Sequence, residues 1–519
     1  MLNLIPYPRS IVQQGGSLVI SSSPAIVADA ELEAVTPWVA ILFNALPPSE
    51  PGGVKIQLQL DAALSISEEY HLKIEPKRIL ITSASSTGAF RGLATLRQLI
   101  WQFRGQGPTL KLPLMTIEDR PRFEWRGLMM DVSRHFFTAD EVCRFLDVMA
   151  LYKFNKFHWH LTDDQGWRFP VTRYPGLTEV GGVRRETLVG HERSRPRQYD
   201  GSLYSYCYTV SDIKRVVAHA ASLQIEVIPE IDMPGHMQAA IAAYPHLGNF
   251  NWPLEVRTHW GISTHILNPL PATIEFMKEV LGEAADLFPG RYIHLGGDEA
   301  IKQQWSESKL AQDRMAQLGL ASEDRMQSWF ISEMAEFLGR SGKRMLGWDE
   351  ITEGGTPDDA IVVGWRGTTH ACAAAMKGHD VVMAPTSHTY FDNYQTEPAT
   401  QPLAIGGLLT LQKVYEFEPR PPELLPEKHH HVLGGQGQLW SEYIPTFEHL
   451  TYMAFPRACA LSETLWCDKT VKNYSDFLPR IRDHQDLLLS YVSRIGPIPE
   501  ISIISPQLNE PDKLSKSIS

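Results

Sequence analysis

The chain has 519 residues, of which 43% are hydrophobic and 21% are charged, a composition typical of a soluble globular protein. This length exceeds the usual size of one domain, so we expect one large domain and at least one smaller one. The formal net charge of -12 is spread along the sequence without a basic run, which argues against nucleic acid and anionic membranes as partners. The composition therefore favours a small or neutral ligand.

No segment of the sequence predicts export or membrane insertion. Residues 1–9 (MLNLIPYPR) show neither a basic leader nor a long apolar stretch, so we expect no signal peptide, and no run of about 18 apolar residues predicts a transmembrane helix. The five cysteines form an odd, scattered set. We expect mostly buried free thiols in a reducing compartment, although Cys459 and Cys467 could pair. These features predict a cytoplasmic protein.

Residues 1–119 carry the pattern of a small α+β domain. Short β-rich segments, such as residues 54–60 (VKIQLQL), precede a stretch from Gly88 to Phe103 with apolar residues at helical spacing. Prolines at 113 and 121 indicate a junction. We therefore predict domains at 1–119 and 120–495, followed by a tail at 496–519 that is rich in proline, serine and charge and adds little to the core.

From Phe123 onward, short apolar runs alternate with longer stretches of helical periodicity, which is typical of βα units and a parallel sheet. Helices are predicted over 138–152, 210–223, 273–288 and 322–340. Eight strands of this kind predict a closed (β/α)8 TIM barrel, so the fold class is α/β with a small α+β domain in front. The strands are expected at 125–131, 156–161, 226–231, 292–296, 344–348, 361–365, 381–384 and 432–439.

Polar or aromatic residues follow every predicted strand. A TIM barrel assembles its active site from the C-terminal ends of its strands, so these residues predict one pocket. A solvated loop or a helix N-cap explains one such group but not eight in register. In strand order they are Asp131 and Arg134; His160, Asp163 and Asp164; Glu230, Asp232 and His236; Asp298 and Glu299; Trp348, Asp349 and Glu350; Trp365; Tyr390 and Asp392; and Trp440 and Glu442.

The residue types in this predicted pocket suit a sugar. Hydroxyl groups need bidentate polar partners, and the apolar face of a sugar ring packs on aromatic planes. Cleavage of a glycosidic bond usually takes two carboxyl groups. Residues 294–299 (HLGGDE) place two of them, Asp298 and Glu299, just beyond the fourth strand, with two glycines that allow a close approach. The sequence therefore predicts a glycosidase.

The HxGGDE segment resembles the signature of the β-N-acetylhexosaminidases of glycoside hydrolase family twenty. The resemblance covers residues 120–490, and residues 1–119 resemble the small domain that commonly precedes this barrel. It implies an exo-acting, retaining enzyme that releases terminal β-linked GlcNAc or GalNAc without a cofactor or a metal. The resemblance extends to six further motifs, which occur in chain order at 131–136 (DVSRHF), 158–168 (HWHLTDDQGWR), 229–236 (PEIDMPGH), 347–350 (GWDE), 390–392 (YFD) and 437–442 (GQLWSE).

The resemblance also implies a mechanism in which the 2-acetamido oxygen of the substrate attacks C1 and gives an oxazolinium ion, so the enzyme supplies no nucleophile. Glu299 is then the general acid and later the base, which requires a raised pKa. Asp298 stays ionised and holds the acetamido N–H, and Tyr390 donates its hydroxyl to the acetamido oxygen. The remaining implied roles are sugar binding by Arg134, Asp392 and Glu442, pocket walls formed by Trp348, Trp365 and Trp440, and positioning of the acid by Asp163 and His236.

One departure from the family pattern concerns the aglycone. Family members often carry a further tryptophan before the eighth strand, but residues 408–415 contain none, which leaves the aglycone preference open. The natural substrate and the oligomeric state are open as well.

Three other readings stay open at this point. His158 and His160 alternate on a strand and would point the same way, so they could bind a metal together with His236 and Asp298. An ordinary retaining β-glycosidase would use Glu299 as the acid and either Asp392 or Glu442 as a covalent nucleophile. A sugar-binding protein without catalysis would share the fold, although it has no use for the acidic pair.

Overall fold

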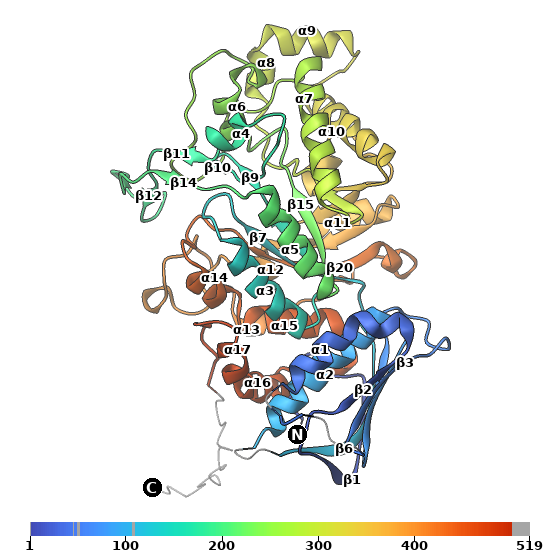
Figure 1. The fold of residues 1–519 in the computed structure, drawn as a ribbon. Coiled ribbons are helices and arrows are strands. Elements are labelled where there is room, and N and C mark those ends of the chain that lie inside the picture. The colour runs from blue at the N-terminus through green and yellow to red at the C-terminus, as the bar shows by residue number, and fades with distance from the viewer. Residues whose placement is uncertain (1, 45, 49–51, 106–108, 501–519) are drawn as a thin grey trace, which may run out of the picture.

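The computed structural model describes residues 2–44, 46–48, 52–105 and 109–500, which form a small N-terminal domain and a larger barrel (Figure 1). In the N-terminal domain, six strands make one sheet in the order β1-β6-β4-β5-β3-β2, and α2 (Ser86–Phe103) packs on β4, β5 and β6. The other elements of this domain are β1 (Ser10–Ile20), β2 (Ala25–Ala28), α1 (Thr36–Leu42), β3 (Lys55–Leu60), β4 (Tyr70–Glu75), β5 (Arg78–Ser83) and β6 (Leu110–Asp119).

From residue 125 onward the chain forms a closed barrel of eight parallel strands, which confirms the predicted fold class. Five of the strands end one or two residues before the predicted limit. For β16 the reason is visible, because Gly296 and Gly297 adopt φ values of 65° and 93° and cannot continue a strand. Around the barrel the strands are β15 (Glu226–Glu230), β16 (Tyr292–His294), β17 (Arg344–Trp348), β18 (Ile361–Gly364), β19 (Val381–Met383), β20 (Val432–Leu439), β7 (Trp125–Asp131) and β8 (Lys156–His160).

The helices lie outside the strands (Figure 1). The four predicted barrel helices are present to within two residues at each end, as α3 (Ala139–Leu151), α5 (Val210–Ser222), α7 (Pro271–Leu287) and α10 (Glu323–Arg340). Thr138 and Thr209 form capping boxes that fix the starts of α3 and α5. Between β17 and β18, all of whose residues are described, the α-helix is replaced by one 3-10 turn, Asp349–Thr352.

The other helices of this part of the chain are short or lie near its end. They are α4 (Gly176–Glu179), α6 (Gln238–Ala243), α8 (Gln303–Glu307), α9 (Lys309–Gln317), α11 (Thr368–Met376), α12 (Thr386–Thr389), α13 (Leu411–Tyr415), α14 (Phe447–Ala454), α15 (Arg457–Trp466), α16 (Tyr474–Asp483) and α17 (Gln485–Leu489). Residues 501–519, most of the predicted tail, lie outside the described residues.

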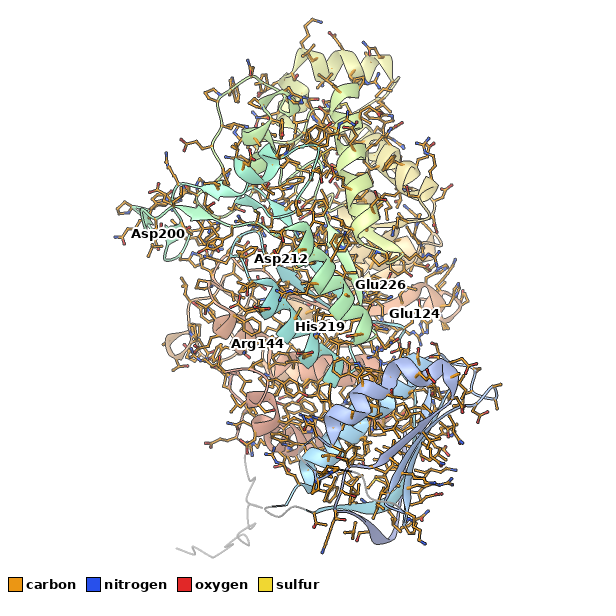
Figure 2. All side chains as sticks on the ribbon, viewed as in Figure 1. Glu124, Arg144, Asp200, Asp212, His219 and Glu226 are labelled. Carbon is orange, nitrogen blue, oxygen red and sulfur yellow. The ribbon has the colours of Figure 1, made fainter. Side chains whose placement is uncertain are left out.

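A long excursion between β8 and α5 carries three two-stranded ribbons, and the two formed within residues 183–205 project to one side of the barrel (Figure 1). Asp200 marks this excursion in Figure 2. The ribbons pair β9 (Thr162–Asp163) with β10 (Gly166–Trp167), β11 (Val183–Arg184) with β14 (Tyr204–Ser205), and β12 (Leu188–Val189) with β13 (Gln198–Tyr199).

The five cysteines are free, and three of them, Cys372, Cys459 and Cys467, are buried. The pairing of Cys459 with Cys467 is therefore not formed. Among the described residues, no helix has the length and apolar character of a membrane span.

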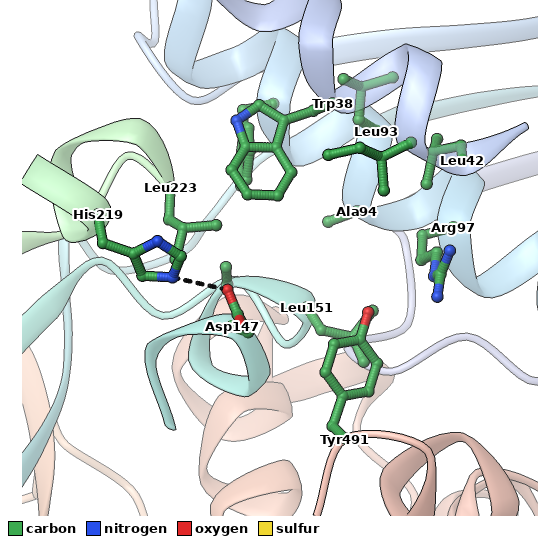
Figure 3. A pocket seen from close by; sticks show the side chains of 13 residues that line it. Trp38, Leu42, Leu93, Ala94, Arg97, Asp147, Leu151, His219, Leu223 and Tyr491 are labelled. Atoms are coloured by element: carbon green, nitrogen blue, oxygen red, sulfur yellow. Dashed lines mark hydrogen bonds and ion pairs between the residues drawn. The ribbon is translucent and has the colours of Figure 1, made fainter. Parts of the chain in front are cut away.

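The N-terminal domain packs against the end of the barrel where the strands begin. Figure 2 shows Glu124 and Glu226, at the starts of β7 and β15, on the side of the barrel that faces this domain. A largely apolar pocket of about 350 Å³ lies at the junction. Figure 3 shows the side chains that line it, most of which come from α1 and α2 on one side and from α3 and α5 on the other. This arrangement leaves the C-terminal ends of the strands uncovered by the N-terminal domain.

Glu68 anchors this junction through buried charge. Its carboxylate accepts hydrogen bonds from Arg91 Nε at 2.7 Å, from Arg126 of β7, and from Asn155 Nδ2 at 3.0 Å. Burial raises the pKa of Glu68, but the two guanidinium groups outweigh this effect and hold the pKa at about 2. The carboxylate is therefore ionised at neutral pH and ties the first domain to the second.

We predict that Glu68→Gln lowers the free energy of unfolding at pH 7 by about 3 kcal/mol, the value that corresponds to the lowered pKa. The stabilisation is complete above the ordinary pKa of about 4.5 and is lost as the pH falls towards about 2. Denaturant titrations of the whole protein should thus show a large difference from the parent at pH 7 and a smaller one at pH 3.

Glu69→Gln is the matched control, because the Glu69 carboxylate pairs with no cation in the described part of the chain. Equal losses of stability in the two variants at pH 7 would contradict an anchoring role for Glu68.

Candidate active site

A pocket of about 310 Å³ lies at the C-terminal ends of the barrel strands. Of the residues predicted to follow the strands, Asp131, His160, Asp164, Glu230, Asp232, Asp349 and Glu350 are outside its lining. The eleven residues to which the sequence analysis gave a catalytic, binding or positioning role all line it, and they come from the ends of all eight barrel strands. These residues are Arg134, Asp163, His236, Asp298, Glu299, Trp348, Trp365, Tyr390, Asp392, Trp440 and Glu442.

Three further lining residues, Thr386, Asn393 and Ile405, were missed by the sequence reasoning. All three lie in the segment after β19. Asn393 follows the YFD motif directly, so its place next to a predicted motif could have identified it as a pocket residue. Ile405 was not predictable in this way, because an apolar residue in a loop carries no pattern, and only the structure shows that it is 39% exposed. It lies near the segment in which family members often carry a tryptophan.

The Asp298–Glu299 pair is placed by a tight turn after β16. A Cβ atom on Gly296 would lie 1.7 Å from Asp232 Oδ1, so only glycine fits there. Glu299 itself adopts φ 48°, a left-handed conformation that is unfavourable for a residue with a side chain. As a result the two neighbours face different surroundings: the Asp298 side chain is 11% exposed, and that of Glu299 is 31% exposed.

His236 lies between Asp163 on one side and the Asp298–Glu299 pair on the other. Its Nδ1 is 3.1 Å from Asp163 Oδ1, and its Nε2 is 3.4 Å from Glu299 Oε2 and 3.6 Å from Asp298 Oδ2. Burial lowers the pKa of His236, but the carboxylates of Asp163 and Asp298 outweigh it and raise the pKa well above the ordinary value. A protonated imidazole at this position donates from Nδ1 to Asp163 and brings its positive charge close to Glu299 and Asp298 through Nε2.

The surroundings of Asp298 oppose the ionised form that its implied role requires. Burial, together with the nearby carboxyl groups of Asp232 and Glu299, raises the pKa of Asp298 well above its ordinary range, against the opposing effect of His236. Burial likewise raises the pKa of Asp232 to about 8. Within the protein alone these groups favour a neutral Asp298, so its ionised form needs a further donor, such as an N–H group of a substrate.

At the opposite end of the pocket, Arg134 lies among carboxylates. Its Nη1 is 3.2 Å from Asp131 Oδ2 and 3.9 Å from Glu442 Oε1, and its Nη2 is 2.8 Å from Asp163 Oδ2. Burial raises the pKa of Glu442, although Arg134 lowers it, and burial with the charge of Glu442 raises the pKa of Asp392 to about 8. This end therefore offers both donors and acceptors at short range, which is what hydroxyl groups require.

The aromatic walls are held by buried carboxyl groups. Trp348 Nε1 donates to Glu230 Oε1 at 2.9 Å, and Trp365 Nε1 donates to Glu350 Oε2 at 2.9 Å. Trp365 also stacks with Tyr390, with ring centroids 6.3 Å apart, and Trp348 lies 5.8 Å from Trp440. The predicted tryptophans thus have fixed orientations at the pocket.

Tyr390 keeps its hydroxyl proton. Burial and the nearby carboxyl group of Asp392 raise the pKa of this phenol well above its ordinary value. Tyr390 is therefore available as a hydrogen-bond donor across the working range of an enzyme.

His158 and His160 turn towards the same side, as their alternation on β8 predicts. Both approach Glu230 Oε2, and His160 Nε2 also lies 2.8 Å from Asp163 Oδ2. The structure joins these histidines to Glu230 and Asp163 rather than to Asp298, which is a different grouping from the metal site considered above.

Two family models match this chain over most of its length. The model of the glycosyl hydrolase family 20 catalytic domain matches residues 123–469, and the model of family 20 domain 2 matches residues 1–120. The chain is 39% identical over 498 residues to a beta-hexosaminidase of Porphyromonas gingivalis, covering 92% of this chain and 62% of that protein. It is 34% identical over 493 residues to a beta-hexosaminidase of Akkermansia muciniphila, covering 91% and 94%.

Solved structures give the same result. A family 20 exo beta-N-acetylglucosaminidase from Vibrio harveyi superposes with a TM-score of 0.83 at 32% identity, covering 94% of this chain and 77% of that one. The N-acetyl-beta-hexosaminidase of Streptomyces plicatus superposes with a TM-score of 0.82 at 30% identity, covering 96% and 97%. The chain therefore belongs to glycosyl hydrolase family 20 and is a glycoside hydrolase of the β-N-acetylhexosaminidase type.

Proposed function

We propose that the protein is an exo-acting, retaining β-N-acetylhexosaminidase that releases a terminal, non-reducing β-linked GlcNAc or GalNAc by substrate-assisted catalysis. The observation that carries this proposal is the adjacent pair Asp298 and Glu299 in the same small pocket as Tyr390. In addition, the Vibrio harveyi relative was solved in complex with N-acetylglucosamine. A substrate that supplies its own nucleophile needs one proton donor and a holder for its acetamide, and these residues can fill both roles.

In the first step, Glu299 gives its proton to the glycosidic oxygen as the bond from C1 to that oxygen breaks, and the acetamido oxygen forms a new bond to C1. In the second step, Glu299 takes a proton from water, and the water oxygen replaces the acetamido oxygen at C1. Two inversions at C1 give net retention. Glu299 suits both steps because its side chain is partly exposed while His236 Nε2 lies 3.4 Å from one of its oxygens.

Asp298 and Tyr390 act on the acetamide. The N–H of the acetamide donates to Asp298, and this donor favours the ionised carboxylate that burial otherwise opposes. The carboxylate then stabilises the positive charge that develops on the nitrogen as the oxazolinium ion forms. Tyr390 donates to the acetamido oxygen and directs it at C1, as its retained hydroxyl proton allows.

The charged end of the pocket accounts for exo action. Arg134, Asp392 and Glu442 bind the hydroxyls of the terminal sugar, while the tryptophans pack on its ring and acetamide. A cavity of about 310 Å³ that ends in an Arg134–Glu442 pair suits one sugar residue with its chain leaving past Glu299. The enzyme would therefore remove residues singly.

We predict that Glu299→Gln lowers kcat for an aryl N-acetyl-β-glucosaminide by about 10²- to 10⁴-fold, the usual contribution of general acid catalysis. The loss should be larger for poor leaving groups, because these depend more on the proton. Steady-state kinetics checks this, with Glu353→Gln as control, since Glu353 is an exposed carboxylate paired with Arg366. An unchanged kcat in Glu299→Gln would remove this residue from the mechanism.

We also expect the enzyme to cleave an aryl N-acetyl-β-glucosaminide but not the matching aryl β-glucoside, because the glucoside lacks the acetamido nucleophile. Both substrates are assayed in the presence of a chelator, so that activity on the first also shows that no removable metal is needed. Comparable rates on the two sugars would instead indicate a covalent nucleophile such as Asp392 or Glu442.

A further inference from the structure

The carboxylate of Glu230 lies in the barrel interior, beneath the pocket and outside its lining. Glu230 ends β15 and is fully buried. Its Oε1 accepts from Trp348 Nε1 at 2.9 Å and lies 2.8 Å from His294 Nδ1, and its Oε2 contacts His160 Nδ1 and lies 3.0 Å from His158 Nε2. Burial raises the pKa of Glu230, but the three histidines outweigh it and hold the pKa well below its ordinary range. The group is an anion at neutral pH.

Two of these histidines carry different charges. The amide of Gln436 donates to His158 Nδ1 at 2.9 Å, so the single proton of His158 lies on Nε2, towards Glu230. Burial lowers the pKa of His158 to about 4, which keeps it neutral. Both nitrogens of His160 face carboxylates, those of Glu230 and Asp163. Burial lowers the pKa of His160, but these carboxylates raise it well above the ordinary value, so His160 is an imidazolium ion.

His160 therefore connects the barrel interior to the pocket. Asp163 receives the second N–H of His160 at 2.8 Å on Oδ2, and Asp163 Oδ1 lies 3.1 Å from His236 Nδ1. His236 Nε2 in turn lies 3.4 Å from Glu299 Oε2. Anionic and cationic groups alternate along this row, from Glu230 through His160, Asp163 and His236 to the acid. His158, in contrast, leads away from the pocket to Gln436.

We propose that Glu230 and His160 are positioning residues for the general acid: they hold Asp163, and through it His236, in the orientation that aims the Glu299 carboxyl group at the glycosidic oxygen. The proposal rests on the proposed function, because it takes Glu299 as the acid. Without the imidazolium of His160, Asp163 keeps Arg134 Nη2 at 2.8 Å from Oδ2 but loses the donor on the side of the barrel interior, so its carboxylate can shift towards Arg134. A misplacement of about 1 Å at a catalytic group costs about 10²-fold in rate.

The test is a comparison of leaving groups. Hydrolysis of 2,4-dinitrophenyl N-acetyl-β-glucosaminide needs little proton donation, whereas hydrolysis of the 4-methoxyphenyl analogue depends on it. We expect His160→Gln to lower kcat/KM about 10²-fold for the 4-methoxyphenyl substrate and only a few-fold for the dinitrophenyl substrate. A residue that merely supports the fold would lower both by the same factor.

His158→Gln is the matched control, because His158 is equally buried and contacts the same carboxylate oxygen but lies off the row that leads to Glu299. It should lower both rates by one common factor. Should His160→Gln fail to fold, Glu230→Gln replaces it, since the amide keeps an acceptor for Trp348 Nε1 and removes only the charge. Thermal unfolding of each variant establishes that it is folded before kinetics are measured.

Equal losses on the two substrates in the His160 or Glu230 variant, or the same leaving-group dependence in His158→Gln, would overturn the proposal. Glu299→Gln serves as the reference. If Glu299→Gln itself shows no leaving-group dependence, the proposed function fails; if it does and the His160 variant does not, only the positioning role fails.

Discussion

A carboxyl group removed from water is stable only if it is paired with a cation or protonated. At the C-terminal ends of these barrel strands, the number of neighbouring cations decides which of the two states each carboxyl group adopts. Glu230 and Asp163 have histidine and arginine partners, and their pKa values are held low. Asp232, Asp298 and Asp392 have fewer, so burial raises their pKa values. The pocket is thus divided between fixed anions that orient and carboxyl groups whose charge a bound substrate can alter.

The N-terminal domain and the proposed catalytic residues lie at opposite ends of the barrel. The N-terminal domain is bound at the starts of the strands, where Glu68 meets Arg126, and the catalytic groups follow the ends of the strands. Stability and chemistry are therefore separated along the barrel axis, as is general for this fold. Changes at the junction can alter the free energy of unfolding without touching the residues that face the substrate.

Much of this arrangement could be predicted from local pattern. Each buried strand is an apolar run followed by polar residues, which is why the strands and the predicted pocket residues were found together. The 3-10 turn after β17 was not predicted, because four residues are too few to show a helical periodicity in the sequence. The charge of Asp298 was also beyond reach, since it depends on Asp232, which comes from another strand and becomes a neighbour only when the barrel closes.

The left-handed backbone at Glu299 lowers the stability of the fold, although the proposed activity needs a carboxyl group at this position. A side chain in this conformation costs roughly 1 kcal/mol relative to the ordinary helical region, and glycine avoids this cost. Selection for stability alone would therefore favour glycine at position 299 and abolish the acid. The residue proposed as the general acid is therefore one at which glycine would give a more stable fold, so stabilising substitutions elsewhere in the chain help to keep it.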